Sequence, residues 1–146
     1  MATEANAPDF VDTVVAVRYA ETDQMGVVYY ANYFVWMEVG RAAWCQARGF
    51  YYRDLEDRHN RILIVAEATC RYKAPARYED RVLIRTAAGP SSDKVIRFIY
   101  EIYNQATGKL LATGETVHVV TDGDLRPSRL PEQFGKLFQP PAGPRS

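Results

Sequence analysis

One change of period along the chain limits its fold more than any other feature of the sequence. From residue 32 to 48 the apolar side chains recur at helical spacing, whereas after residue 60 they alternate with polar ones through four successive segments. One long helix followed by strands on short links predicts an antiparallel sheet packed on that helix. We therefore expect an α+β fold, since no helices remain to cover both faces of a parallel sheet.

The expected helix has one apolar stripe, made of Tyr33, Trp36, Met37, Gly40, Ala43, Trp44 and Ala47. The side chains expected largely opposite to it are Glu38, Arg41, Cys45 and Arg48. Asn32 is predicted to cap the helix N-terminus and Gly49 to end the helix. A mid-helix glycine costs about 1 kcal/mol against alanine, so Gly40 predicts a close approach between helix and sheet.

The strands are expected at 11–19, 61–72, 81–88, 94–103 and 109–121. The last two follow each other closely and should pair antiparallel. A short helical turn is predicted within 126–138. The whole chain, 1–146, is expected to form a single domain, with about 1–10 and 139–146 flexible.

Composition excludes several classes of protein. Eighteen basic residues balance 18 acidic ones, which argues against a general nucleic-acid binder. The start MATEANAPDF lacks the pattern of a signal peptide, and no apolar run approaches the ~20 residues of a membrane span. Cys45 and Cys70 lie far apart, so we interpret them as small buried side chains and predict a cytoplasmic protein.

The usual catalytic motifs are missing from the chain. It contains neither a G-x-S-x-G elbow nor a nucleotide-binding glycine loop. Its two histidines give no H-E-x-x-H, so we expect no metal and no cofactor. His118, on a strand face with Thr116 and Val120, is interpreted as a half-buried histidine with a hydrogen-bond partner, and His59 as a solvated loop residue.

Asp23 lies in a loop, 20–31, that leads through Gly26 into the expected helix. An aspartate here can simply bond to its own backbone in a turn. A catalytic role is the alternative, because the first N–H groups of a helix lack partners within it and attract negative charge, including the oxyanion formed when a carbonyl is attacked. A carboxylate beside such donors could hydrolyse a thioester, since a thiolate leaves without a strong acid.

Three runs of the sequence carry a resemblance to a known family. RYAETDQMGVVYYANYFVWMEVGRAAW (18–44) closely resembles the signature of hot-dog-fold acyl-CoA thioesterases of the 4-hydroxybenzoyl-CoA thioesterase type. EATCRYKAPARYEDRVLIRT (67–86) and GETVHVVTD (114–122) are also similar to this family. The resemblance covers residues 13 to about 135. It implies a five-stranded antiparallel sheet wrapped around one long central helix, and a homodimer or homotetramer with sites at the subunit interface.

The resemblance also implies roles for individual residues. Asp23 matches the catalytic carboxylate, as nucleophile or general base, and the backbone N–H of Tyr30 matches the group that polarises the thioester carbonyl. The positions expected to contact substrate are Gly26, Val28 and Tyr33. Many acyl-CoA members have histidine where this chain has Tyr30, so a histidine-assisted mechanism is not expected and the acyl group stays open. Hydratases of this fold pair their acid with a histidine, and none lies near Asp23.

The implied substrate is an acyl-CoA, whose phosphates would attract basic side chains. The candidates are Lys73, Arg77, Lys94 and Arg126, of which Arg77 and Lys94 are the preferred ones; ordinary solvated charges are the alternative. Two other functions remain open: a hydrolase of acyl groups on an acyl carrier protein, and a non-catalytic acyl-CoA binding module.

Overall fold

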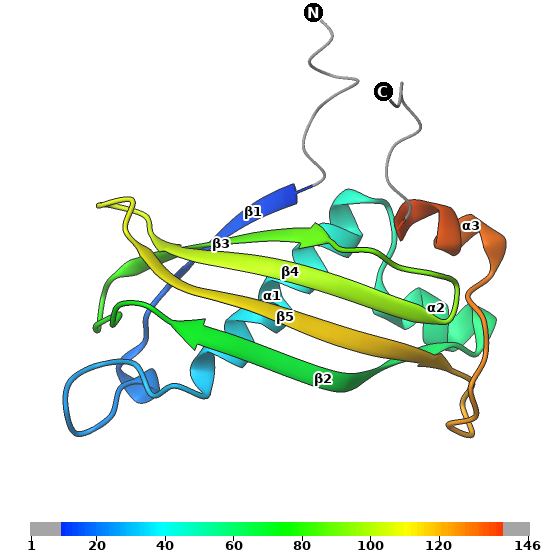
Figure 1. Cartoon of the computed structure of the whole chain (residues 1–146), viewed down its shortest axis with the longest axis horizontal. Coiled ribbons are helices and arrows are strands. Elements are labelled where there is room, and N and C mark those ends of the chain that lie inside the picture. Colours follow the sequence, from blue (N-terminus) through cyan, green and yellow to red (C-terminus); the bar gives the residue numbers. More distant parts are fainter. Residues whose placement is uncertain (1–9, 139–146) are drawn as a thin grey trace, which may run out of the picture.

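A computed structural model describes residues 10–138 of the protein (Figure 1). In chain order its elements are β1 (Phe10–Ala16), η1 (Tyr19–Glu21), α1 (Asn32–Ala47), α2 (Tyr52–His59), β2 (Ile62–Tyr72), β3 (Arg81–Ala88), β4 (Val95–Asn104), β5 (Leu110–Thr121), α3 (Glu132–Gly135) and η2 (Lys136–Phe138). The five strands lie within three residues of their predicted limits at either end. Because β1 begins at Phe10, the expectation of flexibility there is wrong for that residue; for 1–9 and 139–146 it lies outside the described residues.

All five strands form one antiparallel sheet in the order β1-β3-β4-β5-β2. The predicted antiparallel pairing of the last two strands is confirmed by β4 and β5. The chain does not place every strand beside its predecessor, however, because β2 pairs with β5 instead of β3. This crossover leaves β2 at one edge of the sheet, where residues 64–69 are all exposed.

Helix α1 lies across the concave face of the curved sheet (Figure 1). Its contacts are mostly with β1 and β3, so it covers little of β2. The close approach predicted at Gly40 is confirmed: a Cβ there would collide with Thr86 Oγ1 and lie 2.8 Å from Ile84 Cγ2. Trp36 and Trp44 are buried as expected, and Gly49 ends the helix with φ +94°, a conformation that glycine adopts readily.

The predicted distribution of side chains around α1 is wrong in part. Cys45 is 1% exposed, and Arg41 turns inward to donate a hydrogen bond to the Tyr100 hydroxyl (3.3 Å). The burial of Cys45 agrees with its interpretation from the sequence as a small buried side chain, whereas Arg41 is drawn inward by Tyr100 of β4. Ala47, expected in the stripe, is exposed at the helix end.

The predicted N-cap is also wrong. Ala31 occupies the cap position without a side-chain hydrogen bond, and Asn32 is the first residue of α1. The Asn32 side chain instead donates to the main-chain carbonyl of Glu21 (3.0 Å). A tertiary contact with the preceding loop therefore replaces the expected local cap.

A second helix, α2, was not expected from the sequence. It is short and mostly polar, with Leu55 as its buried residue, so it contains too few apolar side chains to be recognised as a helix from their spacing. His59 at its end is not a fully solvated loop residue, because its ring packs edge-on against Phe134 (centroids 4.9 Å apart). Phe134 belongs to α3, which together with η2 confirms the helical turn expected in 126–138. No helix within residues 10–138 is long and apolar enough to cross a membrane.

Candidate active site

The loop between η1 and α1 is closed by backbone hydrogen bonds into a compact turn. The N–H of Asp23 donates to Val27 O (2.9 Å), and the N–H of Gly26 donates back to Asp23 O (3.0 Å). Gly26 has φ +81°, so the turn requires the left-handed conformation that glycine supplies at little cost. One carboxylate oxygen of Asp23 accepts the N–H of Met25 (2.8 Å). Asp23 therefore does form the local turn considered from the sequence, while its other oxygen has no hydrogen-bond partner within residues 10–138.

The unpaired backbone donors lie just before α1 instead of inside it. Asn32, Tyr33 and Phe34 donate their N–H groups to carbonyls three residues earlier. Among the described residues, nothing accepts the N–H of Tyr30 or of Ala31. Free N–H donors were expected from Asn32 onward, but within residues 10–138 of the structure they belong to Tyr30 and Ala31, just before the helix.

Asp23 and Tyr30 line the same cleft, which has a volume of about 370 Å³. Its full lining is Asp23, Met25, Val27, Val28, Tyr30, Tyr33, Tyr72, Ala74 and Pro75. Four of the residues predicted to catalyse or to contact substrate therefore meet in one cleft: Asp23, Tyr30, Val28 and Tyr33. Val28 and Tyr33 are buried and form its floor. Gly26 shapes the turn beside the cleft but does not line it.

Tyr72, at the end of β2, was missed from the sequence because it reads as one more strand residue. Its hydroxyl donates to the Tyr30 carbonyl (2.9 Å), and its ring meets that of Tyr33 edge-to-face (centroids 5.0 Å apart). Burial raises the pKa of both Tyr33 and Tyr72, so both rings stay neutral at physiological pH. The cleft therefore offers these two neutral phenols, the exposed side chain of Tyr30, and a single carboxylate, that of Asp23.

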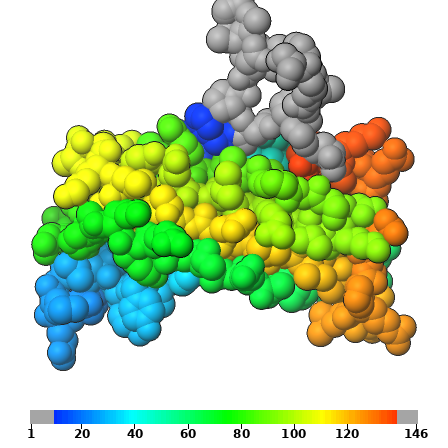
Figure 2. All heavy atoms as spheres, viewed as in Figure 1, coloured from blue at the N-terminus to red at the C-terminus, as the bar shows by residue number. Residues whose placement is uncertain are grey.

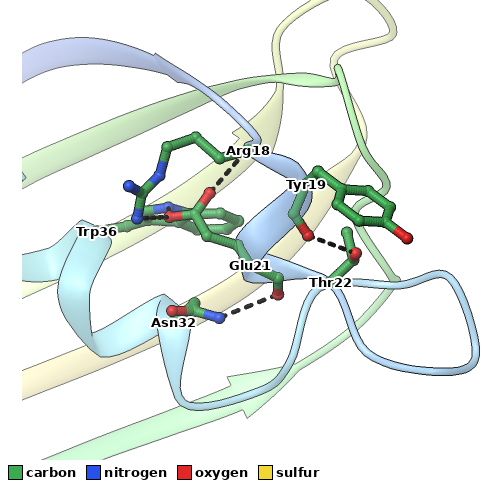
Figure 3. A network of polar contacts seen from close by, with 6 residues as sticks. All are labelled: Arg18, Tyr19, Glu21, Thr22, Asn32 and Trp36. Carbon is green, nitrogen blue, oxygen red and sulfur yellow. Dashed lines mark hydrogen bonds and ion pairs between the residues drawn. The ribbon is translucent and has the colours of Figure 1, made fainter.

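Glu21 is a buried acid that the sequence gave no reason to single out (Figure 3). Its carboxylate accepts the backbone N–H of Arg18 (2.8 Å) and the indole N–H of Trp36 (3.3 Å), and it pairs with the Arg18 guanidinium (3.4 Å). Its main-chain carbonyl accepts from the Asn32 side chain and from the N–H of Tyr29 (2.8 Å). The residue thus ties η1 to the first turns of α1.

Two of the basic candidates lie near the cleft. Arg77 forms a β-bridge with Val27, so its backbone flanks the Asp23 loop, and its side chain is exposed. Lys73 directly follows Tyr72 and is also exposed. Neither side chain lines the cleft itself.

The other two candidates lie at the far end of the sheet. Lys94 O accepts the N–H of Val120, which is paired with Leu63 at the start of β2, nine residues before Tyr72. Nine strand residues span roughly 30 Å. Arg126 belongs to the segment that follows β5. This segment, orange in Figure 2, lies at the end of the molecule opposite the light-blue segment that contains the Asp23 loop. One chain therefore does not bring Lys94 or Arg126 to Asp23.

The remaining reactive side chains lie away from the cleft lining. Burial raises the pKa of Cys45 to about 12 and also raises that of Cys70, so both are neutral thiols, and both are free. His118 is 1% exposed, more buried than expected, and its Nε2 contacts Thr116 Oγ1 (2.9 Å). Across residues 10–138 no three His, Cys, Asp or Glu side chains are placed to hold a metal ion.

A five-stranded antiparallel sheet wrapped around one long helix defines the hot-dog fold. The chain belongs to the thioesterase-like superfamily, which matches residues 17–138. The class expected from the motifs is thus confirmed at the level of fold and family.

Individual relatives are similar over most of their length. YneP of Bacillus subtilis strain 168, named as a candidate acyl-CoA thioesterase, is 40% identical over 85% of this chain and 86% of its own. YbgC of Escherichia coli O157:H7, an acyl-CoA thioester hydrolase, is 31% identical over 86% and 92%. A solved DHNA-CoA thioesterase from Staphylococcus aureus superposes with a TM-score of 0.79 at 35% identity, over 83% and 80%.

Proposed function

We propose that this protein hydrolyses an acyl-CoA thioester to a free acid and coenzyme A. The observation that carries the proposal is that one cleft is lined by Asp23 and by Tyr30, whose N–H has no acceptor among residues 10–138. The names of YneP, YbgC and the S. aureus enzyme support the same reaction. No cofactor or metal is needed, because the thiolate of coenzyme A is a good leaving group.

Asp23 acts in one of two ways in this proposal. As a general base it takes a proton from water, the resulting hydroxyl adds to the thioester carbon, and the C–S bond breaks to release the thiolate, which is then protonated. As a nucleophile its free oxygen adds to that carbon, the thiolate leaves, and water hydrolyses the resulting anhydride. In both routes the Tyr30 N–H donates to the carbonyl oxygen as negative charge develops on it.

The acyl group would lie against the floor of the cleft, over Val28 and Tyr33. Edge-to-face packing of Tyr33 with Tyr72 leaves ring surfaces that could hold an aromatic or an aliphatic group. The cleft thus supports a range of acyl groups, and the native one is to be found with a panel of substrates.

The phosphates of coenzyme A would be held by Arg77 of the same chain and Lys94 of a second chain. This assignment rests on the exposed edge of β2. If two β2 strands pair antiparallel about their middle, the start of one lies beside the end of the other. Lys94, which is joined through Val120 to Leu63, would then approach the partner's Tyr72 and its cleft.

A non-catalytic acyl-CoA binding module is the second candidate. The observation in its favour is the hydrogen bond from Met25 N–H to Asp23, which gives the carboxylate a structural task without any chemistry. On this alternative the cleft binds the ligand and Asp23 only shapes the turn.

Thiol release from short, long and aromatic acyl-CoAs, and from an acylated carrier protein, separates these functions. Turnover on an acyl-CoA that falls roughly a hundredfold to ten-thousandfold in Asp23→Asn supports the proposal. Asp12→Asn is the control, because it also converts a carboxylate to an amide, on β1 at the edge of the sheet opposite to β2. Absence of turnover on every substrate, or an Asp23→Asn enzyme as active as the control, would establish the binding module instead.

A further inference from the structure

Glu21 is 5% exposed, and a carboxylate is rarely so buried unless every oxygen has partners. Here the partners come from two elements that are separate in sequence. Arg18 approaches one oxygen through its N–H and the other through its guanidinium, and the Trp36 indole N–H approaches the second oxygen as well. The charge is therefore compensated, and the carboxylate holds η1 against the second turn of α1.

The main chain of Glu21 forms the base of the loop that carries Asp23. Its carbonyl accepts the N–H of Tyr29 and the Asn32 amide, and the next pair outward is a β-bridge between Thr22 and Val28. Asp23 stands just beyond this bridge, and Tyr30 directly follows Tyr29. The separation between the proposed catalytic carboxylate and the proposed oxyanion donor is thus set across two backbone pairs, Glu21 with Tyr29 and Thr22 with Val28, which Glu21 anchors.

We propose that Glu21 is a positioning residue, whose buried carboxylate fixes Asp23 relative to the Tyr30 N–H and so sets the rate of the chemical step. The inference rests on the proposed function, because it gives Asp23 and Tyr30 their catalytic roles. Glu21 does not line the cleft, so it does not touch the substrate. Its loss should act on kcat and leave KM nearly unchanged, whereas a residue that only stabilises the fold would change neither while the protein stays folded.

Glu21→Gln is the most direct variant. The amide keeps the shape but offers one acceptor oxygen and one N–H₂ donor. The N–H₂ end of the glutamine cannot accept a hydrogen bond, yet it must face either the Arg18 N–H or the Trp36 indole N–H, which are both donors. A displacement of about 1 Å in an active site can cost on the order of a hundredfold, so we expect kcat to fall roughly tenfold to a hundredfold.

Glu115→Gln is the matched control, since it also converts a carboxylate to an amide and breaks an ion pair, with Arg97 on the sheet. It should keep wild-type kcat and KM. Trp36→Phe removes one donor of the network and keeps an aromatic ring, so it should lower kcat in the same way by a smaller factor. If Glu21→Gln does not fold, Trp36→Phe decides: unchanged kcat in a folded Trp36→Phe protein overturns the inference.

A double-variant cycle with Asp23→Asn separates this inference from the proposed function. If Glu21 acts through Asp23, then Glu21→Gln should cost less than about twofold further once Asp23→Asn is present. Full additivity of the two losses overturns the positioning role. An Asp23→Asn enzyme with normal turnover overturns the proposed function, whereas loss in Asp23→Asn with normal kcat in Glu21→Gln overturns the inference alone.

Backbone hydrogen exchange supplies a readout that needs no substrate. Glu21→Gln should lose amide protection at residues 22–29 while the protection of β4 stays as in the wild type, because a local anchor is lost and the sheet is not. Unchanged protection at 22–29 would show that the carboxylate does not hold the loop.

Discussion

The hydroxyl of Tyr72 donates to the main-chain carbonyl of Tyr30 across 2.9 Å, although the two residues are 42 positions apart in the sequence. This bond joins the end of the edge strand β2 to the entrance of α1. Through it the sheet braces the peptide group that follows the proposed oxyanion donor. The contact lies at the rim of the cleft, where β2 would meet a second subunit.

Tyr72→Phe removes that hydrogen bond and retains the ring contacts with Tyr30 and Tyr33. A typical hydrogen bond contributes ~0.5–1.5 kcal/mol, so we expect kcat to fall by up to about tenfold, with the fold intact. Steady-state kinetics measure this. Tyr103→Phe, which loses a hydroxyl bond to Glu101 away from the cleft, is the control and should have normal turnover. Equal kinetics for the two variants would show that the Tyr30 carbonyl needs no brace.

Tyr30→Phe should keep most of the activity, because the proposed part of Tyr30 is played by its backbone N–H. Tyr30 is 59% exposed, so its hydroxyl can be removed without opening the core. Loss of an oxyanion donor costs on the order of a hundredfold or more in kcat. A fall of that size in Tyr30→Phe would mean that the hydroxyl takes part in the chemistry and that the oxyanion assignment is wrong.

The exposed edge of β2 predicts that the protein is at least a dimer, because long unpaired strand edges invite pairing. Sedimentation should show no stable monomer at micromolar concentration. Ala68→Glu places two like charges across the paired edges and should release monomers. Ala47→Glu, at an exposed helix position, is the control and should stay associated. If the wild type were a monomer, no Lys94 of a second chain could reach the cleft, and its proposed role in binding phosphate would be wrong.

Because His118 is buried, we expect the free energy of unfolding to fall in mild acid. Burial, with a smaller effect from the charge of Arg41, lowers its pKa from 6.5 to about 4. The unfolded chain then binds more protons than the folded one between these values, so stability is full above pH 6.5 and is lost as the pH falls toward 4. At about 1.4 kcal/mol per pKa unit, the loss approaches about 3 kcal/mol.

Urea unfolding at pH 7.5 and 4.5 tests this for the wild type and for His118→Gln. The variant cannot take up the proton, so its stability should depend less on pH by about the same amount. His59→Gln removes the half-buried histidine at the end of α2 and serves as the control. Identical pH dependence in wild type and His118→Gln would contradict the prediction.

Turnover should survive prolonged chelation. Among the residues that line the cleft, Asp23 alone carries a side chain that commonly binds a metal ion. A catalytic zinc site takes about three protein ligands. The measurement is thiol release after dialysis against EDTA. Activity that disappears and returns with zinc or manganese would show that the mechanism proposed for Asp23 is wrong.

The sequence alone determined the features that depend on local periodicity. The secondary structure is indicated by the apolar stripe of α1 and by the alternation in the five strands. The glycines at positions 26, 40 and 49 likewise indicate tight turns or a close approach of the backbone. The motif around Asp23 could be matched to a family because its residues are contiguous. These features were enough to predict the fold class and to select Asp23 and Tyr30.

Tertiary structure decided what depends on residues far apart in the chain. The pairing of β2 with β5, which exposes an edge and carries Lys94 away from Asp23, follows from a choice among several antiparallel orders that the same pattern allows. Tyr72 meets Tyr30, and Glu21 meets Trp36, only because the sheet curls around α1. Long-range packing also replaced the expected Asn32 cap and drew Arg41 inward to Tyr100, since a side chain's environment is set by the elements that surround it and not by its neighbours in sequence.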